Sequence, residues 1–443
     1  MPSDRISTDK NVLNEHGGDA WHAHSMPDAV VVPQNEEEVQ KVMRVASKYQ
    51  IAVTARGAGR GYVGSCVPVQ GGISLSLAKL SRILKISAPD SLAVVQPAVI
   101  TGVLQNAAKR KGLFYPPDPA SLNESSIGGN IATNAGGPRC LKYGVTKNYV
   151  MGLNVVLPNG DLVKTGGQTH KNKLGFNLAE LFCGSEGMLG IITEATLRLI
   201  PYPPARSVMV ASFSKVGQAA KAVMRIQQAG FLPCALEIAD NFTLAAARGY
   251  NTSVPPGESL IIVELDGQPG SVKHEIKQLK EVIKKLGALH ISTASTETSA
   301  EKLWDIRRSF SYSLRATGLH KMNHDVVVPR GKLTALFKVA SVIQKKYNYQ
   351  VASFGHAGDG NIHVNIMVQP DKAKTLKVRK AVDYLFKSVL EMGGTITGEH
   401  GVGLARKPWW NDATTPELRS LHQKVKNALD PQRILNPGKF LDQ

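Results

Sequence analysis

The sequence predicts an α+β protein with more than one domain, and three observations carry this prediction. The chain has 443 residues, and its 42% hydrophobic content is enough for sizeable cores. Short apolar segments with strand character alternate with longer segments that suit helices. The cluster Pro201-Tyr202-Pro203-Pro204 interrupts this pattern and marks a domain boundary.

The first part of the chain begins with a strand and a capped helix. Residues 29–33 predict the strand, and Asn35 suits the N-cap of a helix whose first turn carries three glutamates. Residues 101–111 also favour a helix, with Gly112 at the position of a C-terminal cap. Further strands are predicted at residues 51–55, 72–77 and 92–96.

A hairpin and an apolar strand complete this part. Val150–Leu157 and Leu162–Thr165 flank the turn Pro158-Asn159-Gly160-Asp161, which is typical of a hairpin. The segment from Met188 to Ile200 has the composition of buried strands and ends at the proline cluster.

After residue 204, strands and helices alternate regularly, which predicts an α+β unit with helices packed on one sheet. The strands are expected near residues 207–213, 235–239, 259–265 and 288–293, and the helices near 216–229, 241–249, 271–286 and 299–315. Two more helices, near 332–347 and 373–392, bracket a segment that contains histidines.

That segment places His356 and His363 among glycines, and Gly398-Glu399-His400-Gly401 follows downstream. Imidazole and carboxylate groups together suit zinc, manganese or iron(II). A histidine beside a metal-binding glutamate is also placed to move a proton near neutral pH. If the two segments meet, they form a metal-assisted acid–base site; the alternative is that each histidine is structural.

Charge and cysteine content narrow the class of protein. The formal charge of +18 suits nucleic acid, an anionic membrane surface or an acidic protein. The basic residues are spread along the chain without a nucleic-acid-binding motif. We therefore expect most of them to lie on solvent-exposed faces of helices, and we expect no nucleic acid partner. Four scattered cysteines without a C-x-x-C pair argue against an iron–sulfur cluster, a Cys-ligated zinc site and a disulfide framework.

The sequence also indicates a cytoplasmic location. No apolar run approaches the roughly 18 residues of a membrane helix. The N-terminus lacks the basic and then apolar layout of a secretory signal.

Three glycine-rich segments lie in the first part of the chain: residues 56–65, 125–137 and 184–193. Backbone N–H groups in such loops can bind pyrophosphate, and glycines let a large ligand approach closely. The first loop is not a Rossmann fingerprint, because Tyr62 stands where the last glycine belongs, and it is not a P-loop. Three such segments together indicate a site for a large planar or phosphorylated ligand rather than turns alone.

With Tyr115-Pro116-Pro117-Asp118-Pro119, these segments resemble the FAD domain of the vanillyl-alcohol oxidase/PCMH flavoprotein superfamily. The histidine segment, residues 398–401 and the terminal Asn436-Pro437-Gly438-Lys439 are similar to one branch of it. That branch contains D-lactate dehydrogenase, D-2-hydroxyglutarate dehydrogenase and the flavin D subunit of glycolate oxidase.

The resemblance extends from about Asp28 to Phe440 and implies a PCMH-type FAD-binding domain of two α+β subdomains. It also implies a cap domain with a ferredoxin-like antiparallel sheet. The expected divisions are an N-terminal arm (1–27), the FAD-binding domain (28–204), the substrate-binding cap (205–395) and a C-terminal segment that returns to the FAD domain (396–443).

The resemblance assigns FAD contacts to these segments. Residues 56–65 would bind the pyrophosphate, residues 117–118 and 127–137 would line the flavin and ribityl chain, and Gly187, Gly190 and Ile192 would approach the adenine end. The expected contacts are Arg56, Gly57, Ala58, Gly59, Arg60, Gly61, Gly64, Ser65, Pro117, Asp118, Ser121, Gly128, Gly129, Asn130, Ala132, Thr133, Gly136, Gly137, Gly187, Gly190, Ile192 and Asn436. Some relatives attach FAD covalently through a histidine in the pyrophosphate loop; this loop has none, so noncovalent FAD is expected.

The resemblance also assigns the chemistry. His356, His363 and Glu399 would bind a divalent metal (zinc, manganese or iron), and His400 would be the general base.

Substrate binding is assigned to the helix near 299–315. Arg307 would bind the substrate carboxylate, which a guanidinium matches bidentately, and Ser311 would face the same pocket. Taken alone, Arg307 better suits a surface salt bridge. D-2-hydroxyglutarate dehydrogenases carry a lysine where Asn323 is the closest match here, and Lys321 is out of register. A small monocarboxylate therefore fits better than a dicarboxylate.

The predicted reaction is FAD-dependent oxidation of a small D-2-hydroxy acid, D-lactate or glycolate, to the 2-oxo acid. The metal would lower the pKa of the hydroxyl, His400 would take its proton, and hydride would pass from C2 to flavin N5. Electrons would leave to an external acceptor: a quinone, a cytochrome, an electron-transfer flavoprotein or a partner subunit. The basic surface keeps peripheral membrane association open.

Alternatives within the same fold are a D-2-hydroxyglutarate-type dehydrogenase, a noncatalytic FAD subunit of a multi-subunit glycolate oxidase, and a transferase similar to alkylglycerone-phosphate synthase. An alternative of another class is a basic binding protein for nucleic acid.

Overall fold

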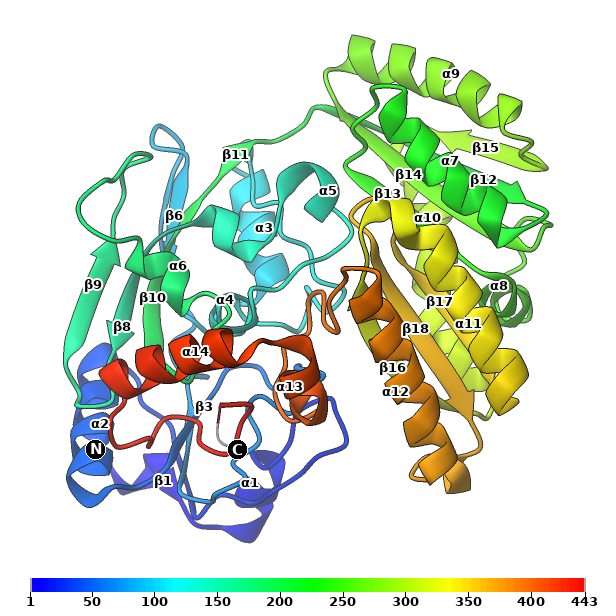
Figure 1. The fold of residues 1–443 in the computed structure, drawn as a ribbon. Helices are drawn as coiled ribbons and strands as arrows, with labels where there is room; N and C mark the ends of the chain where they lie inside the picture. The colour runs from blue at the N-terminus through cyan, green and yellow to red at the C-terminus, as the bar shows by residue number, and fades with distance from the viewer. Residues whose placement is uncertain (1, 442–443) are drawn as a thin grey trace. The chain divides into compact units, whose positions relative to one another are not determined.

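A computed structural model describes residues 2–441, and the chain forms two compact units (Figure 1). Unit 1 comprises Met1–Gly137, Val145–Tyr202 and Glu399–Gln443; unit 2 comprises Pro138–Gly144 and Pro203–Gly398. Both units combine helices with β-sheets, so the predicted α+β class is confirmed. Among residues 2–441, no helix is both long and apolar enough to cross a bilayer.

The first sheet of unit 1 has four strands in the order β1-β2-β4-β3, and only β1 runs antiparallel to its neighbour. Helix α2 (Glu36–Tyr49) packs on it through Val39 and Met43. The predicted cap is confirmed, since the side chain of Asn35 accepts a hydrogen bond from the backbone N–H of Glu38 at 2.9 Å. The strands are β1 (Ile6–Ser7), β2 (Ala29–Val31), β3 (Val53–Arg56) and β4 (Ile73–Ser76).

The second sheet of unit 1 is antiparallel, in the order β5-β6-β10-β8-β9. The predicted hairpin is confirmed as β8 and β9, and α3 ends within two residues of its predicted limit. Strand β5 was not predicted, because its partly exposed sequence lacks a clear apolar pattern. The bounds are β5 (Ile83–Ser87), β6 (Leu92–Val95), α3 (Thr101–Lys109), β8 (Val150–Val156), β9 (Leu162–Gly166) and β10 (Ile191–Arg198).

Short elements complete unit 1. Helix α4 lies in the second glycine-rich segment, and α14 lies near the C-terminus. These elements are α1 (Lys10–Glu15), β7 (Leu113–Phe114), α4 (Ile127–Thr133), α6 (Leu178–Phe182), β11 (Ile200–Pro201), α13 (Trp410–Ala413) and α14 (Pro416–Leu429), with β7 and β11 paired.

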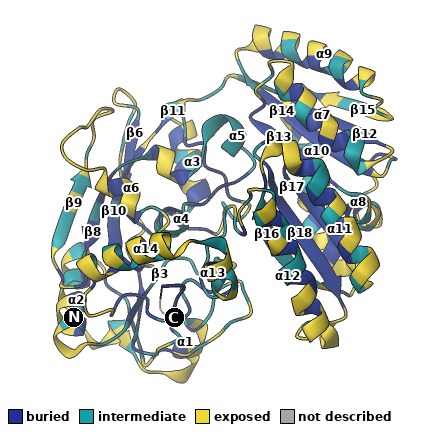
Figure 2. Ribbon diagram, viewed as in Figure 1, coloured by how far each residue is buried: buried dark blue, intermediate teal, exposed yellow. Residues whose placement is uncertain are grey.

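Unit 2 is built on one antiparallel sheet of seven strands in the order β15-β12-β14-β13-β17-β18-β16. The strands are β12 (Ala205–Phe213), β13 (Ala235–Ala239), β14 (Ser259–Gly267), β15 (His290–Ala294), β16 (His320–Val327), β17 (Gln350–His356) and β18 (Asn361–Val368). The sheet interior is dark blue in Figure 2, whereas the outer sides of its helices are yellow.

Helices cover both faces of this sheet. Helices α7, α9, α11 and α12 pack on one face, and α8 and α10 contact each other on the other (Figure 1). Their bounds are α7 (Val216–Gln228), α8 (Asn241–Arg248), α9 (Pro269–Lys285), α10 (Glu297–Ala316), α11 (Leu333–Tyr347) and α12 (Leu376–Glu391). The short helix α5 (Cys140–Tyr143) also belongs to unit 2, although its neighbours in sequence belong to unit 1.

The histidine segment forms the hairpin of β17 and β18, where the sequence analysis predicted no strands. In β18, Asn361, His363 and Asn365 alternate with Ile362, Val364 and Ile366, and all eight residues are buried. The alternation with a period of two was therefore present. Because every second residue is polar although buried, the segment did not have the apolar composition expected of a buried strand.

Candidate active site

The register of the sheet in unit 2 gathers polar side chains on one face. Glu237 lies opposite His356, Phe354 lies opposite His363, and Asp325 lies opposite His363 on the other side. Residues directly opposite each other point to the same side, so both histidines share the face that α10 covers. The face becomes polar only toward this end, since Phe310 and Met367 pack in its apolar core.

One group of possible metal ligands is present among residues 2–441, formed by His356, His363 and Glu399. One ligand atom from each lies within 4.8 Å of the other two, and both histidines are buried. Two imidazoles and one carboxylate form a donor set that suits zinc, manganese or iron. Glu399 directly follows Gly398, whose backbone N–H donates to Asp325 Oδ2 at 2.8 Å. The carboxylate of Asp325 on β16 thus fixes the position at which the chain enters Glu399.

The buried carboxylate of Glu237 joins two of the predicted site residues. One of its oxygens lies 2.6 Å from His356 Nδ1, and the other accepts a hydrogen bond from Arg307 Nε at 2.5 Å. Burial opposes ionisation of Glu237, but the adjacent His356 and Arg307 outweigh it and lower its pKa to about 2.

Arg307 on α10 is therefore not a surface residue. Its guanidinium carbon lies 4.8 Å from the centre of the Phe354 ring, which suits a cation–π contact. Among the hydrogen bonds of residues 2–441, Arg307 donates through Nε and not through its two terminal nitrogens. A fixed guanidinium of this kind can bind a carboxylate with two parallel hydrogen bonds.

Lys321 lies beside the second residue predicted for the substrate. Its ammonium donates to Ser311 Oγ at 2.6 Å, and Ser311 lies one helical turn after Arg307. Burial and the neighbouring Arg315 and Arg307 lower the pKa of Lys321 to about 8. In sequence, Lys321 is offset by two residues from the position of the lysine in D-2-hydroxyglutarate dehydrogenases, but the pairing of β16 in the sheet brings its side chain to α10.

In unit 1, backbone contacts bring the glycine-rich segments together. The N–H of Ala58 donates to Ser126 Oγ at 3.2 Å, which joins the first segment to the start of α4. The N–H groups of Gly184 and Glu186 donate to carbonyls of α4, at Ile131 and Ala132. All three segments therefore meet around α4.

Two further predicted cofactor residues belong to this assembly. A methyl group at Gly137 would lie 2.4 Å from the carbonyl oxygen of Asp118, so only glycine permits this approach. Asn436 donates through Nδ2 to the carbonyls of Ser65 and Glu186, while its buried Oδ1 has no partner in residues 2–441. An acceptor of this kind suits a hydroxyl or amine of a bound nucleotide.

Glu186 is the central side chain of this assembly, and it is buried. Its carboxylate accepts hydrogen bonds from Ser65 Oγ at 2.6 Å and from the backbone N–H groups of Val402 and Gly403 at 2.7 and 2.9 Å. Burial raises its pKa, although these bonds favour the charged form. Glu186 thus ties the predicted pyrophosphate loop to the residues that follow His400.

A cavity of about 370 Å³ lies against the pyrophosphate loop. Its lining includes residues of the N-terminal arm, among them Asp19, which accepts a hydrogen bond from the N–H of Gly64 at 2.9 Å. Arg56, Ala58, Gly59 and Arg60 of the loop also line it. Backbone N–H groups of this glycine-rich loop and the nearby Arg56 guanidinium suit the pyrophosphate of a dinucleotide such as FAD.

Some predicted cofactor residues have other contacts. Arg60 forms an exposed ion pair with Glu124 at 2.9 Å. A methyl group at Gly190 would lie 2.4 Å from Val155, so this glycine permits strand packing. Ser121 lies in a turn, where its carbonyl accepts from the N–H of Ser125. The remaining predicted residues lie within the segments already described. They are Gly57, Gly61, Ser65, Pro117, Gly128, Gly129, Asn130, Thr133, Gly136, Gly187 and Ile192.

The predicted base, His400, lies in unit 1. Its ring stacks on Tyr62 with centroids 5.3 Å apart, and its Nε2 lies 3.9 Å from a carboxylate oxygen of Glu399. The loop of residues 56–65 therefore contacts the imidazole through an aromatic ring.

Sequence reasoning missed several residues that organise these sites. Glu186 could have been found, since it is a charged residue inside the third glycine-rich segment. Glu237 interrupts the apolar strand Ala235–Ala239, which is also a visible signal. Asp19 and Asp325 offered no such signal, because their partners Gly64 and Gly398 lie far away in the sequence.

Comparisons with known families match both parts of the chain. The model described as FAD binding domain matches residues 27–166, and the model described as FAD linked oxidases, C-terminal domain, matches residues 202–440. Glycolate oxidase subunit GlcD of Bacillus subtilis is 39% identical over 419 residues, covering 94% of this chain and 89% of the relative. D-lactate dehydrogenase of Anaerostipes hadrus is 32% identical over 436 residues, covering 96% and 92%.

Solved structures show the same fold at low sequence identity. p-Cresol methylhydroxylase with bound substrate has a TM-score of 0.80 at 20% identity and covers 100% of this chain and 94% of its own. Alkyldihydroxyacetonephosphate synthase has a TM-score of 0.79 at 19% identity, with 99% and 84% covered.

Proposed function

The chain belongs to the family of FAD-linked oxidases with a PCMH-type fold, and from this premise we propose that it oxidises a small D-2-hydroxy acid to the 2-oxo acid. The observation that carries the proposal is Glu237, which holds a predicted metal ligand and the predicted carboxylate-binding arginine in one buried contact. D-Lactate and glycolate are the proposed substrates, because relatives are named for them.

FAD would be held in unit 1 without a covalent bond. The glycine-rich segments and Asn436 would contact it, and Arg56 would lie near its pyrophosphate. When bound, FAD accepts a hydride at N5. The protein would supply the binding site and the orientation of the flavin.

A divalent cation would be held by His356, His363 and Glu399. When bound, such a cation acts as a Lewis acid on substrate oxygens. Asp325 would support this set through Gly398, and Glu237 would orient His356.

The side chains of this protein perform the remaining work. The two terminal nitrogens of Arg307 would bind the carboxylate of the substrate, and Ser311 would donate a further hydrogen bond. His400 would take the proton of the 2-hydroxyl group, a task that suits an imidazole near neutral pH. Tyr62 would keep this imidazole in place by stacking.

Lys321 favours a second candidate substrate class. A buried ammonium beside Ser311 and Arg307 would also suit an acid with a second anionic group, as in D-2-hydroxyglutarate. A monocarboxylate would leave this cation without a counter-charge.

The electrons would pass to an external acceptor: a quinone, a cytochrome, an electron-transfer flavoprotein or a partner subunit. Two relatives are named as subunits of glycolate oxidase, which supports a protein partner for this chain as well. The net charge of +18 would favour an acidic acceptor surface or an anionic membrane, so turnover with the acceptor should fall as ionic strength rises.

The direct test is anaerobic bleaching of the bound flavin by D-lactate, L-lactate, glycolate and D-2-hydroxyglutarate. We expect bleaching by a D-acid or glycolate and none by L-lactate. A flavin that stays oxidised with every acid would contradict the proposed function.

A further inference from the structure

The surroundings of the Glu237 side chain require an ionised carboxylate at this position. It lies on the central strand β13, directly opposite His356 on β17, and its side chain is 1% exposed. Both groups that contact its carboxylate can donate, one from the imidazole Nδ1 and one from the guanidinium Nε. An ionised carboxylate accepts on both oxygens and needs no donor of its own.

The contact with His356 decides which nitrogen of the imidazole can bind a cation. When Nδ1 donates its proton to Glu237, the lone pair is on Nε2, which is the form that binds a metal. Loss of the acceptor would allow the proton to move to Nε2 and would free the ring to rotate.

The contact with Arg307 decides the direction of the guanidinium. Glu237 accepts from Nε on one edge, while the rings of Phe354 and Phe310 lie within 4.8 and 5.8 Å of the guanidinium carbon. The opposite edge, with its two terminal nitrogens, is therefore the one presented to a ligand.

We propose that Glu237 is a positioning residue that fixes His356 as a metal ligand and Arg307 as the carboxylate-binding group at the same time. The proposal rests on the proposed function for the identities of cation and substrate. One carboxylate then sets two affinities, so a single substitution should weaken cation binding and carboxylate binding together.

Glu237→Gln is the discriminating variant. It keeps the size of the side chain but offers one acceptor and one donor, so it satisfies only one of the two N–H groups. If the amide N–H₂ faces His356, the imidazole must accept at Nδ1 and carry its proton on Nε2. If it faces Arg307, two donors oppose each other and the guanidinium loses its anchor.

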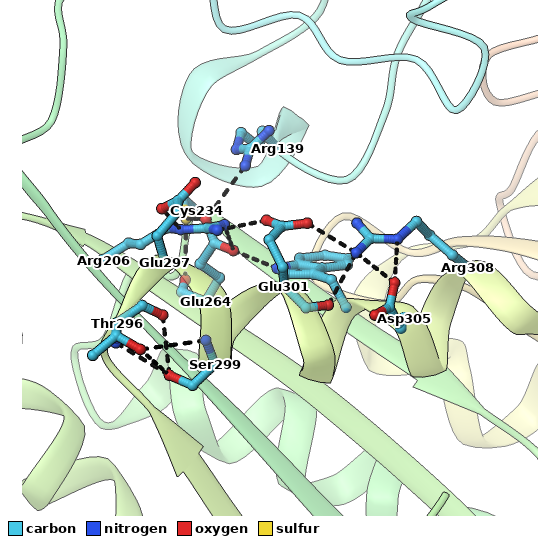
Figure 3. Close-up of polar contacts among 11 residues, drawn as sticks. Arg139, Arg206, Cys234, Glu264, Thr296, Glu297, Ser299, Glu301, Asp305 and Arg308 are labelled. Atoms are coloured by element: carbon cyan, nitrogen blue, oxygen red, sulfur yellow. Dashed lines mark hydrogen bonds and ion pairs between the residues drawn. The ribbon is translucent and has the colours of Figure 1, made fainter. Parts of the chain in front are cut away.

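Glu264→Gln is the matched control. Glu264 is also 1% exposed, lies on the adjacent strand β14, and contacts arginines, Arg139 and Arg206 (Figure 3). It also accepts from the indole of Trp304 and from Cys234. None of these residues has a predicted role in binding the cation or the substrate.

The experiment uses the full-length protein loaded with FAD. Zinc affinity is measured by competition with a chromophoric chelator, and carboxylate affinity by the change in flavin absorbance as pyruvate is added. We expect Glu237→Gln to lower zinc affinity by about 10- to 100-fold, as is typical when a partner of a metal-binding histidine is lost. Pyruvate affinity should fall in the same variant, and Glu264→Gln should change neither by more than about twofold.

Two results would overturn the inference: wild-type zinc affinity in Glu237→Gln, or equal losses in both variants, which would indicate general damage to unit 2. A melting curve of each variant separates damage from loss of positioning. If pyruvate does not affect the wild-type flavin, the proposed substrate class fails, and zinc affinity still decides the role of Glu237.

Discussion

In unit 1 the predicted cofactor residues are mostly glycines and small residues held by backbone contacts, whereas in unit 2 the predicted ligands are side chains on a buried sheet face. Each assembly nevertheless depends on one buried carboxylate. Glu186 in unit 1 accepts from a hydroxyl and two backbone N–H groups, and Glu237 in unit 2 accepts from two side chains. A site built from backbone groups tolerates changes of side chain, whereas a site built from side chains is lost when one of those side chains is replaced.

Replacement of His400 should have the largest effect on the reaction and little effect on FAD binding. His400→Ala removes the proposed base and its stacking on Tyr62 but leaves the backbone of the glycine-rich segments unchanged, so FAD should stay bound. Flavin reduction by the substrate should slow by roughly 10²- to 10⁴-fold, the usual contribution of a general base. Stopped-flow single turnover measures this rate, and an unchanged rate would remove His400 from the mechanism.

A second test concerns Glu186. Glu186→Ala leaves the N–H groups of Val402 and Gly403 without their acceptor, and the loss should cost roughly 1–3 kcal/mol for the buried N–H of Gly403. Urea denaturation measures the free energy of unfolding, and FAD should also dissociate more readily. The exposed Glu180→Ala on α6 is the control, and equal stability of both variants would contradict the role given to Glu186.

A third test uses the pH dependence of substrate binding in unit 2, where Lys321 carries an ammonium with a lowered pKa. The pKa of Lys321 is about 8, so its charge is lost as pH rises above that value, and the KM for an anionic substrate should rise by about tenfold, the equivalent of roughly 1.4 kcal/mol. Between about pH 8 and the ordinary lysine pKa of 10.5, Lys321 is protonated in the unfolded chain but largely neutral in the folded protein. Because the unfolded chain binds more protons in this range, Lys321 makes the free energy of unfolding rise with pH there. In Lys321→Met the alkaline rise in KM should disappear; its persistence would assign it to another group.

A last pair of substitutions concerns backbone conformation. Gly187 has a φ of +72° with no atom closer than 4.0 Å to an added methyl group, so Gly187→Ala should cost about 1–2 kcal/mol through backbone strain alone. Gly217→Ala in α7 has open space and helical backbone, so it should stabilise by roughly 0.5–1 kcal/mol. Thermal melting of both variants tests the contrast, and two equal shifts would argue against it.

The same difference explains how far the sequence could predict each region. The glycine-rich segments are local patterns that can be recognised in the sequence, and hydrogen bonds bring them together around α4. The sites in unit 2 depend on register: Lys321 reaches Ser311, and Asp325 reaches Gly398, only because β16 pairs with β18 at a particular alignment. Neither alignment nor the alternation of β18 could be read from residue spacing, because buried polar residues replaced the apolar pattern.

Removal of the cation from the FAD-loaded protein tests the proposed metal site directly. A chelator followed by gel filtration should abolish anaerobic flavin reduction by the active hydroxy acid while the flavin content stays at the wild-type level. Added zinc, manganese or iron should then restore reduction in the wild-type protein but not in His363→Ala. Full reduction of the flavin in protein shown by elemental analysis to be free of divalent metal would contradict the central claim.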